Sequence, residues 1–280
     1  MSNMDLIAIT GATGHIGRIV TNLLSSAGAR TRLVVRDPNR VPTGSADVKQ
    51  ATYGDREAAT RALQGAGVLF MVSAAESADR LEQHRTFVDA AAAAGVRHVV
   101  YTSFLGAAPD ATFTLARDHW ATEEHLRASG MSWTFLRDSF YLDFLPTLAG
   151  DDGVIRGPAG DGRVGAVARS DVARSAAGVL AAPDVHAGHT YDLTGPEALS
   201  LAEVARTITE ITGRTTTYQT ETIEEAYAFR QHYGVPDWQL DAWVSTYTAI
   251  ASGALSLVTD TVESLTGTAP LNLTRLLQGS

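Results

Sequence analysis

Three glycines near the start of the chain have the spacing of a phosphate-binding turn. Gly11, Gly14 and Gly17 directly follow an apolar run that ends at Thr10. In such a turn the first glycine permits a tight bend, the second lets the backbone approach a pyrophosphate, and the third lets the next helix pack close to the strand. The free N–H groups and positive dipole end of that helix then face the phosphates. The spacing therefore predicts a nucleotide site with these candidate ligands: Gly11, Thr13, Gly14, His15, Ile16 and Gly17.

This turn needs a strand before it and a helix after it, and the sequence predicts both. Residues 5–10 form an apolar run without helical period, which is typical of a buried parallel strand. Beyond the turn, apolar residues recur at helical spacing, at Ile16, Ile19, Val20, Leu23 and Leu24. A glycine-rich turn without a ligand is the alternative, and the strand–turn–helix context argues against it.

The end of the second predicted strand, residues 31–35, bears on the choice of nucleotide. In dinucleotide-binding folds an acidic residue there holds the ribose 2′-hydroxyl of NAD, whereas an arginine accommodates the 2′-phosphate of NADP. Arg36 offers a planar fork of donors and Arg40 a second charge. Asp37 is the counter-argument, since it could be aimed at a ribose, and a solvated loop is the remaining alternative. The two arginines favour NADP, as NADPH, over NAD.

Small and polar side chains follow further predicted strands, at the sheet edge where open α/β sheets bind ligands. Ser73 and Ala74 follow the fourth strand, where small side chains would let the backbone lie against the cofactor. Thr102 and Ser103 end the fifth strand with hydroxyl groups. Asp55 begins the helix after the third strand and is first an N-cap, with a secondary role beside the adenine. All five are candidate cofactor-binding residues.

Composition limits the classes of protein to consider. The chain has 280 residues, 45% hydrophobic and 19% charged, as in an ordinary soluble globular protein. No apolar run approaches the roughly eighteen residues of a membrane span. An acidic Asp5 and the lack of a basic n-region argue against a secretory signal, so we expect a cytoplasmic protein without a membrane partner. The net charge of −9 argues against nucleic acid as a partner.

Alternating strand and helix patterns predict an α/β fold, a Rossmann-type doubly wound parallel sheet with a smaller C-terminal substrate lobe. We expect the dinucleotide-binding core in residues 1–138, with 163–195 returning to it. The lobe is expected in 139–162 and 196–280. Helical faces of this fold often pair, which leaves a homo-oligomer open.

Five motifs resemble the NmrA-like branch of atypical short-chain dehydrogenase/reductases, most closely the type-2 NAD(P)H quinone oxidoreductases. They are Gly11–Arg18, Val35–Pro38, Tyr53–Asp55, Val100–Ser103 and Trp133–Arg137. The resemblance implies a Rossmann domain, NADPH and hydride transfer to a conjugated aromatic acceptor. This chain departs from those reductases at Asp138, where they carry asparagine. The candidate substrate contacts lie near the end of the fifth strand and after the sixth: Tyr101, Phe104, Asp138, Phe140 and Tyr141.

The proton donor of ordinary short-chain dehydrogenases is absent from this sequence. Their Tyr-x-x-x-Lys dyad uses a lysine to lower the pKa of the tyrosine, and Lys49, in the third strand, is the single lysine here. His119 and Glu123 stand one helical turn apart where the dyad would lie. His119 could protonate a reduced substrate, oriented by Glu123. A surface pair, or a histidine that packs on the cofactor, is the alternative.

Other chemistries lack support in the sequence. There is no cysteine, and the remaining histidines are scattered without metal-binding spacing, so no metal is expected. The Gly-x-Ser-x-Gly elbow of hydrolases is also missing. The favoured function is therefore an NADPH-dependent reductase of a quinone or similar aromatic small molecule. The alternative is a non-catalytic dinucleotide-binding redox sensor of the NmrA type, which the missing dyad favours and the intact glycine turn and aromatic lobe oppose.

Overall fold

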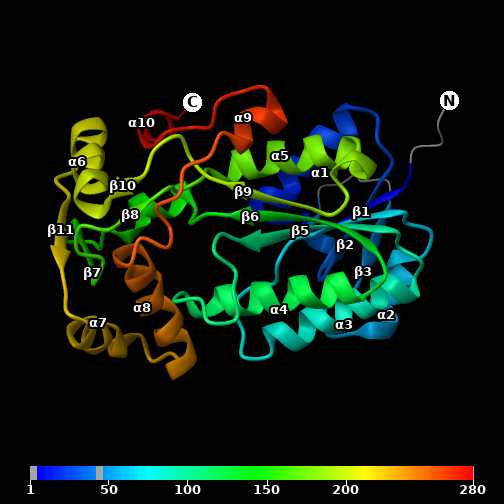
Figure 1. Cartoon of the computed structure of the whole chain (residues 1–280), viewed down its shortest axis with the longest axis horizontal. Helices are drawn as coiled ribbons and strands as arrows, with labels where there is room; N and C mark the ends of the chain where they lie inside the picture. The colour runs from blue at the N-terminus through cyan, green and yellow to red at the C-terminus, as the bar shows by residue number, and fades with distance from the viewer. Residues whose placement is uncertain (1–4, 42–46, 280) are drawn as a thin grey trace. The chain divides into compact units, whose positions relative to one another are not determined.

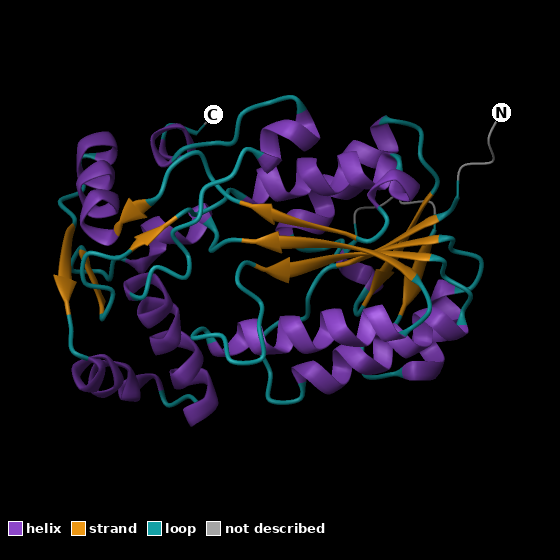
Figure 2. Cartoon of the chain, in the orientation of Figure 1, coloured by secondary structure: helices purple, strands orange, loops and turns teal. Residues whose placement is uncertain are grey.

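A seven-stranded parallel sheet organises the first part of the chain (Figures 1 and 2). The structure is a computed structural model that describes residues 5–41 and 47–279. The strand order β3-β2-β1-β4-β5-β6-β9 reverses direction between β1 and β4, which is the switch point of a doubly wound fold. The predicted fold class is therefore confirmed. The strands are β1 (Ile7–Thr10), β2 (Thr31–Val35), β3 (Val48–Gln50), β4 (Val68–Met71), β5 (His98–Phe104), β6 (Ser132–Asp138) and β9 (His189–Leu193).

Helices cover both faces of this sheet (Figure 1). On one side lie α1 (His15–Ser26) and α5 (Arg169–Ala181). The other side carries α2 (Arg56–Leu63), α3 (Arg80–Ala93) and α4 (Thr114–Ala128). The expected N-cap of α2 is confirmed, because the Asp55 carboxylate accepts a hydrogen bond from the Ala58 N–H at 2.9 Å. Two 3₁₀ turns, η1 (Pro38–Arg40) and η3 (Pro183–His186), join these elements.

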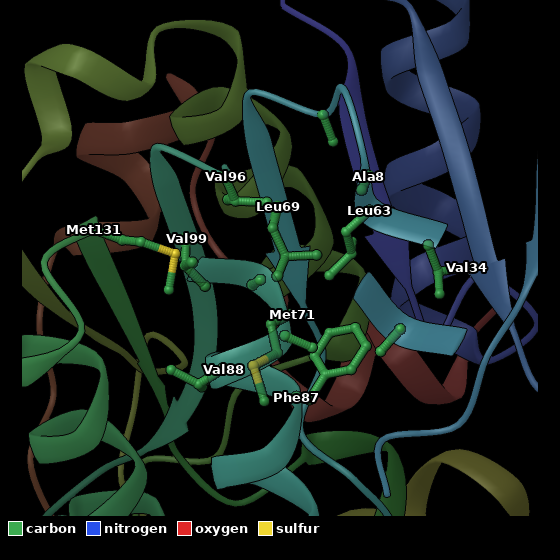
Figure 3. Close-up of a cluster of buried hydrophobic side chains, with 14 of the residues drawn as sticks. Ala8, Val34, Leu63, Leu69, Met71, Phe87, Val88, Val96, Val99 and Met131 are labelled. Carbon is green, nitrogen blue, oxygen red and sulfur yellow. The ribbon is translucent and has the colours of Figure 1, made fainter. Parts of the chain in front are cut away.

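The core of this part lies between the sheet and the α2–α3 side (Figure 3). Every residue of β1 and β4 is buried, which explains why both strands are apolar without alternation. Leu69 and Met71 of β4 and Phe87 of α3 are fully buried there. Phe87 also stacks on Tyr53, with ring centroids 4.2 Å apart.

The chain divides into two compact units, and the second has its own core. The first unit comprises the chain up to Ser103, Asp118–Arg137 and Val172–Tyr191. The second comprises Phe104–Arg117, Asp138–Asp171 and Asp192–Ser280. Two small sheets belong to the second unit, antiparallel β10–β8 and parallel β11–β7. The strands of these sheets are β7 (Val154–Gly157), β8 (Arg163–Val164), β10 (Leu199–Ser200) and β11 (Thr217–Thr220). The other elements of the second unit are helical: η2 (Leu142–Leu148), α6 (Leu201–Thr212), α7 (Ile223–Arg230), η4 (Gln231–Tyr233), α8 (Asp237–Ala251), α9 (Thr261–Thr266) and α10 (Leu273–Leu277).

The division differs from the expected boundaries, 1–138 with 163–195 against 139–162 with 196–280, of which residues 1–4, 42–46 and 280 lie outside the described part. The second unit takes 104–117, 163–171 and 192–195 in addition. Backbone bonds between strand ends explain this, because the Leu105 N–H donates to the Asp138 carbonyl and the Ser139 N–H to the Leu193 carbonyl.

Local signals in the second unit have mixed outcomes. The sequence predicts one strand over 163–169, but β8 ends at Val164 because the Gly165 N–H donates to the Leu255 carbonyl. Capping boxes open both α6 and α7, through Ser200 with Glu203 and Thr222 with Glu225, and both have the Ser/Thr-x-x-Glu spacing that predicts a helix start. Within the described residues, no helix combines the length and apolarity needed to cross a membrane.

The core of the first unit generates a stability prediction. Phe87→Ala removes a side chain with 0% exposure, and we expect the free energy of unfolding to fall by about 3–5 kcal/mol. Leu23→Ala is the control, because Leu23 is 39% exposed on α1 and should lose under about 1 kcal/mol. Urea unfolding followed by circular dichroism measures both. Equal losses would contradict the assignment of this core.

Candidate dinucleotide site and the residues that shape it

A cavity of about 410 Å³ lies within the first unit, at the carboxyl ends of β1, β2 and β4. Open α/β sheets bind ligands at this position, outside the switch point of the strand order. Seven of the expected cofactor-binding residues line the cavity: Gly11, Thr13, Gly14, Arg36, Arg40, Ser73 and Ala74. The structure thus brings together residues from three separate loops, as the sequence predicts for one nucleotide site.

The glycine turn has the geometry of a phosphate cradle. Gly11 has a φ of +62°, which side chains rarely allow, and its carbonyl accepts the Gly14 N–H at 2.8 Å. A Cβ on Gly17 would lie 2.3 Å from the Gly11 carbonyl oxygen, so helix α1 can approach the turn only with glycine there. Gly14 is the N-cap of α1 and supplies no side-chain cap. The first N–H groups of the helix therefore suit an anionic ligand.

The other expected residues of the turn have different places. His15 begins α1 and is partly exposed, whereas Ile16 and Gly17 are buried. Among the expected polar ligands outside the turn, Asp55 is occupied as the cap of α2 and does not line the cavity. Thr102 and Ser103 also lie outside the lining and bind protein groups instead. Thr102 holds the cavity wall through the Ser73 N–H, whereas Ser103 binds Glu123.

Two arginines give the cavity a positive end. Arg36 and Arg40 both line it, and neither forms an ion pair with a carboxylate in the part of the chain that the structure describes. Asp37 instead caps its own turn, where its Oδ1 accepts the Asn39 N–H at 3.0 Å. The alternative in which Asp37 holds a ribose hydroxyl is therefore disfavoured. A group with several acceptor oxygens, such as a 2′-phosphate, matches the two guanidinium groups.

Three consecutive backbone N–H groups after β4 are bound by side chains, although the strand has ended. The Val72 N–H donates to Thr10 Oγ1 at 2.9 Å, and the Ser73 N–H donates to Thr102 Oγ1 at 2.8 Å. The Ala74 N–H donates to His84 Nε2 at 2.9 Å. This segment, residues 72–74, forms one wall of the cavity. Its backbone is held by the protein itself and needs no ligand to order it.

Tyr53, which follows β3, also binds the backbone of this wall. Its hydroxyl donates to the Val72 carbonyl at 2.5 Å and lies 2.6 Å from Thr10 Oγ1. Burial raises the pKa of Tyr53 above its ordinary value, with the hydrogen bond from Thr10 acting in the opposite direction. The phenol therefore stays neutral and keeps its donor at physiological pH.

The structure places His119 and Glu123 in two separate hydrogen-bond systems. His119 Nδ1 is 2.9 Å from the Tyr101 hydroxyl, and Nε2 is 2.9 Å from the Arg80 guanidinium. The Glu123 carboxylate accepts from Ser103 Oγ at 2.6 Å and from both Arg137 Nε and Nη2, at 2.9 and 2.6 Å. Tyr101 and Arg80, and not the expected Glu123, therefore orient the histidine ring. Burial, reinforced by Arg80, holds the pKa of His119 well below its ordinary value.

Four of the five expected substrate residues lie in the second unit: Phe104, Asp138, Phe140 and Tyr141. Phe104 packs on Phe113, with ring centroids 4.7 Å apart, and Phe140 on Phe144, with centroids 6.2 Å apart. The fifth, Tyr101, has 0% exposure and belongs to the core of the first unit. Tyr101 therefore packs inside the protein and does not line a surface that a substrate could reach.

Asp138 is a buried carboxyl with an unusual environment. Tyr141 donates its hydroxyl proton to Asp138 Oδ2 at 2.9 Å, while Oδ1 is buried with no hydrogen-bond partner among the described residues. Burial raises the pKa of Asp138 well above its ordinary value, with the Tyr141 hydrogen bond opposing this. Burial therefore favours the neutral form of this carboxyl.

Sequence reasoning missed Tyr53, Gln83, Arg80 and His84. Tyr53 and Gln83 line the cavity, and Arg80 and His84 bind the backbone of its wall. One signal was available, because Arg80 and His84 lie four residues apart in a predicted helix and so share a face. No group of three or more potential metal ligands occurs in the described ranges.

The fold and the site together define a nicotinamide dinucleotide-binding protein of the Rossmann class. A profile of NAD(P)H-binding proteins matches residues 11–183. Quinone oxidoreductase 2 of Escherichia coli is 36% identical over 270 residues, 94% of each chain. An NAD(P)H azoreductase of Xenophilus azovorans is 33% identical over 268 residues, 94% of this chain and 93% of the other. The solved structure of the E. coli NADPH-dependent quinone oxidoreductase with NADPH has a TM-score of 0.89 at 34% identity, covering 98% and 99% of the two chains.

The chain belongs to this NAD(P)H-binding family, and the resemblance to type-2 quinone oxidoreductases is confirmed. The glycine turn fits the group that the family binds, because the turn leaves the α1 N–H groups uncapped beside two arginines.

The glycine turn generates a prediction for cofactor binding. Gly14 has an extended backbone that valine also adopts, at φ −86° and ψ 176°, and a Cβ there would lie 3.2 Å from the Gly11 carbonyl oxygen, so Gly14→Val folds if the turn shifts by a few tenths of an ångström. Its branched side chain would stand where a pyrophosphate must approach, and we expect cofactor affinity to be lost. Fluorescence titration with NADPH measures the affinity, with the thermal midpoint as the control for folding. Unchanged affinity would show that the turn has a structural role alone.

Asp138 generates a prediction for pH dependence. Because its folded-state pKa is raised above the ordinary 3.8, its contribution to stability falls as pH rises from that value through the folded-state pKa. Asp138→Asn removes this titration, so the variant should gain stability relative to wild type between pH 4 and pH 8. The measurement is urea unfolding at several pH values in that range.

Asp152→Asn is the matched control. Asp152 is exposed, and the hydrogen bond from Arg156 lowers its pKa, so its contribution to stability changes with pH in the opposite direction. That variant should not gain stability with rising pH. A gain for Asp138→Asn that stayed constant across the pH range would contradict the neutral carboxyl.

Proposed function

We propose that this protein is an NADPH-dependent oxidoreductase that reduces a quinone or a similar conjugated aromatic compound. The observation that carries the proposal is the arginine-ended cavity, with Arg36 and Arg40 beside a glycine turn. Support also comes from the relatives named as quinone oxidoreductase and azoreductase, which match over 94% of this chain.

The chain's own residues bind and orient the two reactants. The α1 N-terminus and the turn from Gly11 to Gly17 hold the pyrophosphate, and Arg36 and Arg40 hold the 2′-phosphate. The wall at residues 72–74 then fixes the path of the cofactor along the sheet edge. When bound, NADPH supplies a hydride from its nicotinamide ring. The proposed contacts of the acceptor are Phe104, Asp138, Phe140 and Tyr141.

Proton supply explains why a quinone suits this protein. Reduction of a quinone by NADPH takes up one hydride and one proton and yields a hydroquinone and NADP⁺. The hydroquinone oxygens can take that proton from water, so no Tyr–Lys dyad is required. Holding the two reactants in register can itself supply much of the acceleration. A ketone needs a positioned proton donor more than a quinone does.

His119 is a proposed proton donor for such acceptors only if its ring gives up one of its protein partners. Its nitrogens face Tyr101 and Arg80, and its low pKa keeps the ring neutral. We therefore propose reactant positioning as the main catalytic contribution. A cytoplasmic location and a homo-oligomer stay predictions.

A panel of acceptors tests the proposed function. NADPH consumption is followed at 340 nm with benzoquinones, naphthoquinones, azo dyes, triphenylmethane dyes, ketones and enones. We expect turnover with quinones above the other classes. Tight NADPH binding without turnover of any acceptor would contradict the proposal and favour a redox sensor.

Arg36 generates a prediction for cofactor choice. Arg36→Ala should weaken the affinity for NADPH by about ten- to a hundredfold, because a charge-assisted contact contributes roughly 1.5–3 kcal/mol. NADH has no 2′-phosphate and should be affected far less. Titration of both dinucleotides measures the ratio, with the exposed Arg61→Ala on α2 as the control. An equal loss for both cofactors would show that Arg36 does not contact the phosphate.

A further inference from the structure

Both backbone groups of Ala74 are bound by charged or titratable side chains of one helix. The Ala74 N–H donates to His84 Nε2 at 2.9 Å, and the Ala74 carbonyl accepts from Arg80 Nε at 3.0 Å. Arg80 and His84 belong to α3 and are 4% and 0% exposed. Ala74 itself lines the dinucleotide cavity. Two buried polar side chains are thus devoted to one residue of the cavity wall.

Further buried side chains contact Arg80 and His84 behind that wall. Arg80 Nη2 is 2.9 Å from His119 Nε2, and His119 Nδ1 is 2.9 Å from the Tyr101 hydroxyl. On the other side, Thr122 Oγ1 is 2.9 Å from His84 Nδ1. Arg80 and His84 are thus each held from behind by a residue of α4, His119 and Thr122 respectively. We name this set the Ala74 ring; its side chains are Arg80, His84, Tyr101, His119 and Thr122.

The donors in the Ala74 ring determine the state of both histidines. A guanidinium and a backbone N–H can only donate, so the Nε2 atoms of His119 and His84 must both accept. Each ring is then neutral and carries its proton on Nδ1. His84 donates that proton to Thr122, and His119 donates its own to Tyr101.

Each ring nitrogen of His84 and His119 has a partner, so the side chains of the set depend on one another. Thr122 accepts from His84 and donates its own proton to the Asp118 carbonyl at 2.7 Å. Arg80 also lies 3.3 Å from the Asp118 carboxylate, which compensates its buried charge. Removal of one acceptor leaves a buried donor unpaired, and the side chain that carries this donor loses a contact that fixes its orientation.

We propose that the Ala74 ring is a positioning device for the dinucleotide, in which Arg80 and His84 set the backbone of the cavity wall and His119 holds Arg80. This inference rests on the proposed function of the cavity as an NADPH site. It gives the His119 side chain a role without proton transfer to substrate. Because the wall is fixed before binding, the cofactor loses less free energy in ordering it.

Variants of His84 test the proposal on the apoprotein and by titration with NADPH. His84→Leu removes the acceptor of the Ala74 N–H, and we expect the dissociation constant for NADPH to rise about tenfold, the scale of one hydrogen bond. His84→Gln keeps an acceptor at that position and should restore most of the affinity. The thermal midpoint of each apoprotein is measured in parallel.

His98→Leu is the matched control, because His98 is also buried, on β5, and pairs with Thr134 away from the cavity. It should lower the thermal midpoint as His84→Leu does and leave NADPH affinity unchanged. If both leucine variants weakened NADPH equally, or neither did, the Ala74 ring would be a structural feature alone and the proposal would be overturned.

His119→Leu separates positioning from proton transfer. We expect it to raise the Michaelis constant for NADPH several-fold with every acceptor, while kcat at saturating NADPH changes by less than about twofold. A loss of about 10²-fold in kcat confined to ketones or enones would instead make His119 the proton donor. Wild-type binding without turnover would contradict the proposed function and leave these affinity tests of the ring intact. A wild-type protein that bound no dinucleotide would overturn both.

Discussion

Hydrogen bonding of the backbone just beyond β4 is the constraint on which the site depends. A strand that ends in the middle of a sheet leaves N–H groups that must find partners or water. Here Thr10 of β1, Thr102 of β5 and His84 of α3 each take one of them. Side chains of the neighbouring strands and of α3 therefore continue the hydrogen bonding of the sheet beyond the point where the backbone ladder ends. The result is an irregular segment that is as fully bonded as a strand.

This constraint couples the cavity to the layer of helices beneath it. Arg80 and His84 reach the wall from α3, and His119 and Thr122 belong to α4. An unpaired polar group in such a layer would cost more free energy than its hydrogen bond contributes. Burial favours neutral histidines, and Asp118 compensates the one buried guanidinium of the set. The packing of two helices thereby becomes part of the binding site.

Features that reside in one short segment could be predicted from the sequence. The glycine turn, the arginines after β2 and the small residues after β4 each belong to one loop, and all three loops line the cavity. The helix caps at Asp55 and Ser200 were equally local. The doubly wound parallel sheet was predicted from the alternation of apolar runs and amphipathic helices.

Features that depend on long-range pairing could not be predicted. His84 contacts Thr122, 38 residues away, and no local pattern indicates that contact. The direction of Tyr101 was also hidden, because β5 is buried on both faces and shows no alternation. The boundaries of the two compact units also depend on long-range pairing, since they follow backbone bonds between the ends of β5, β6 and β9.

Amide hydrogen exchange of the free protein, resolved by residue, tests most directly whether this wall is built before the cofactor binds. The account predicts that the amides of Val72, Ser73 and Ala74 exchange as slowly as those of Leu69 and Phe70 inside β4. The exposed Ala78 nearby supplies the rate of an unprotected amide. Exchange of Ser73 and Ala74 at the rate of Ala78 would contradict a preformed wall.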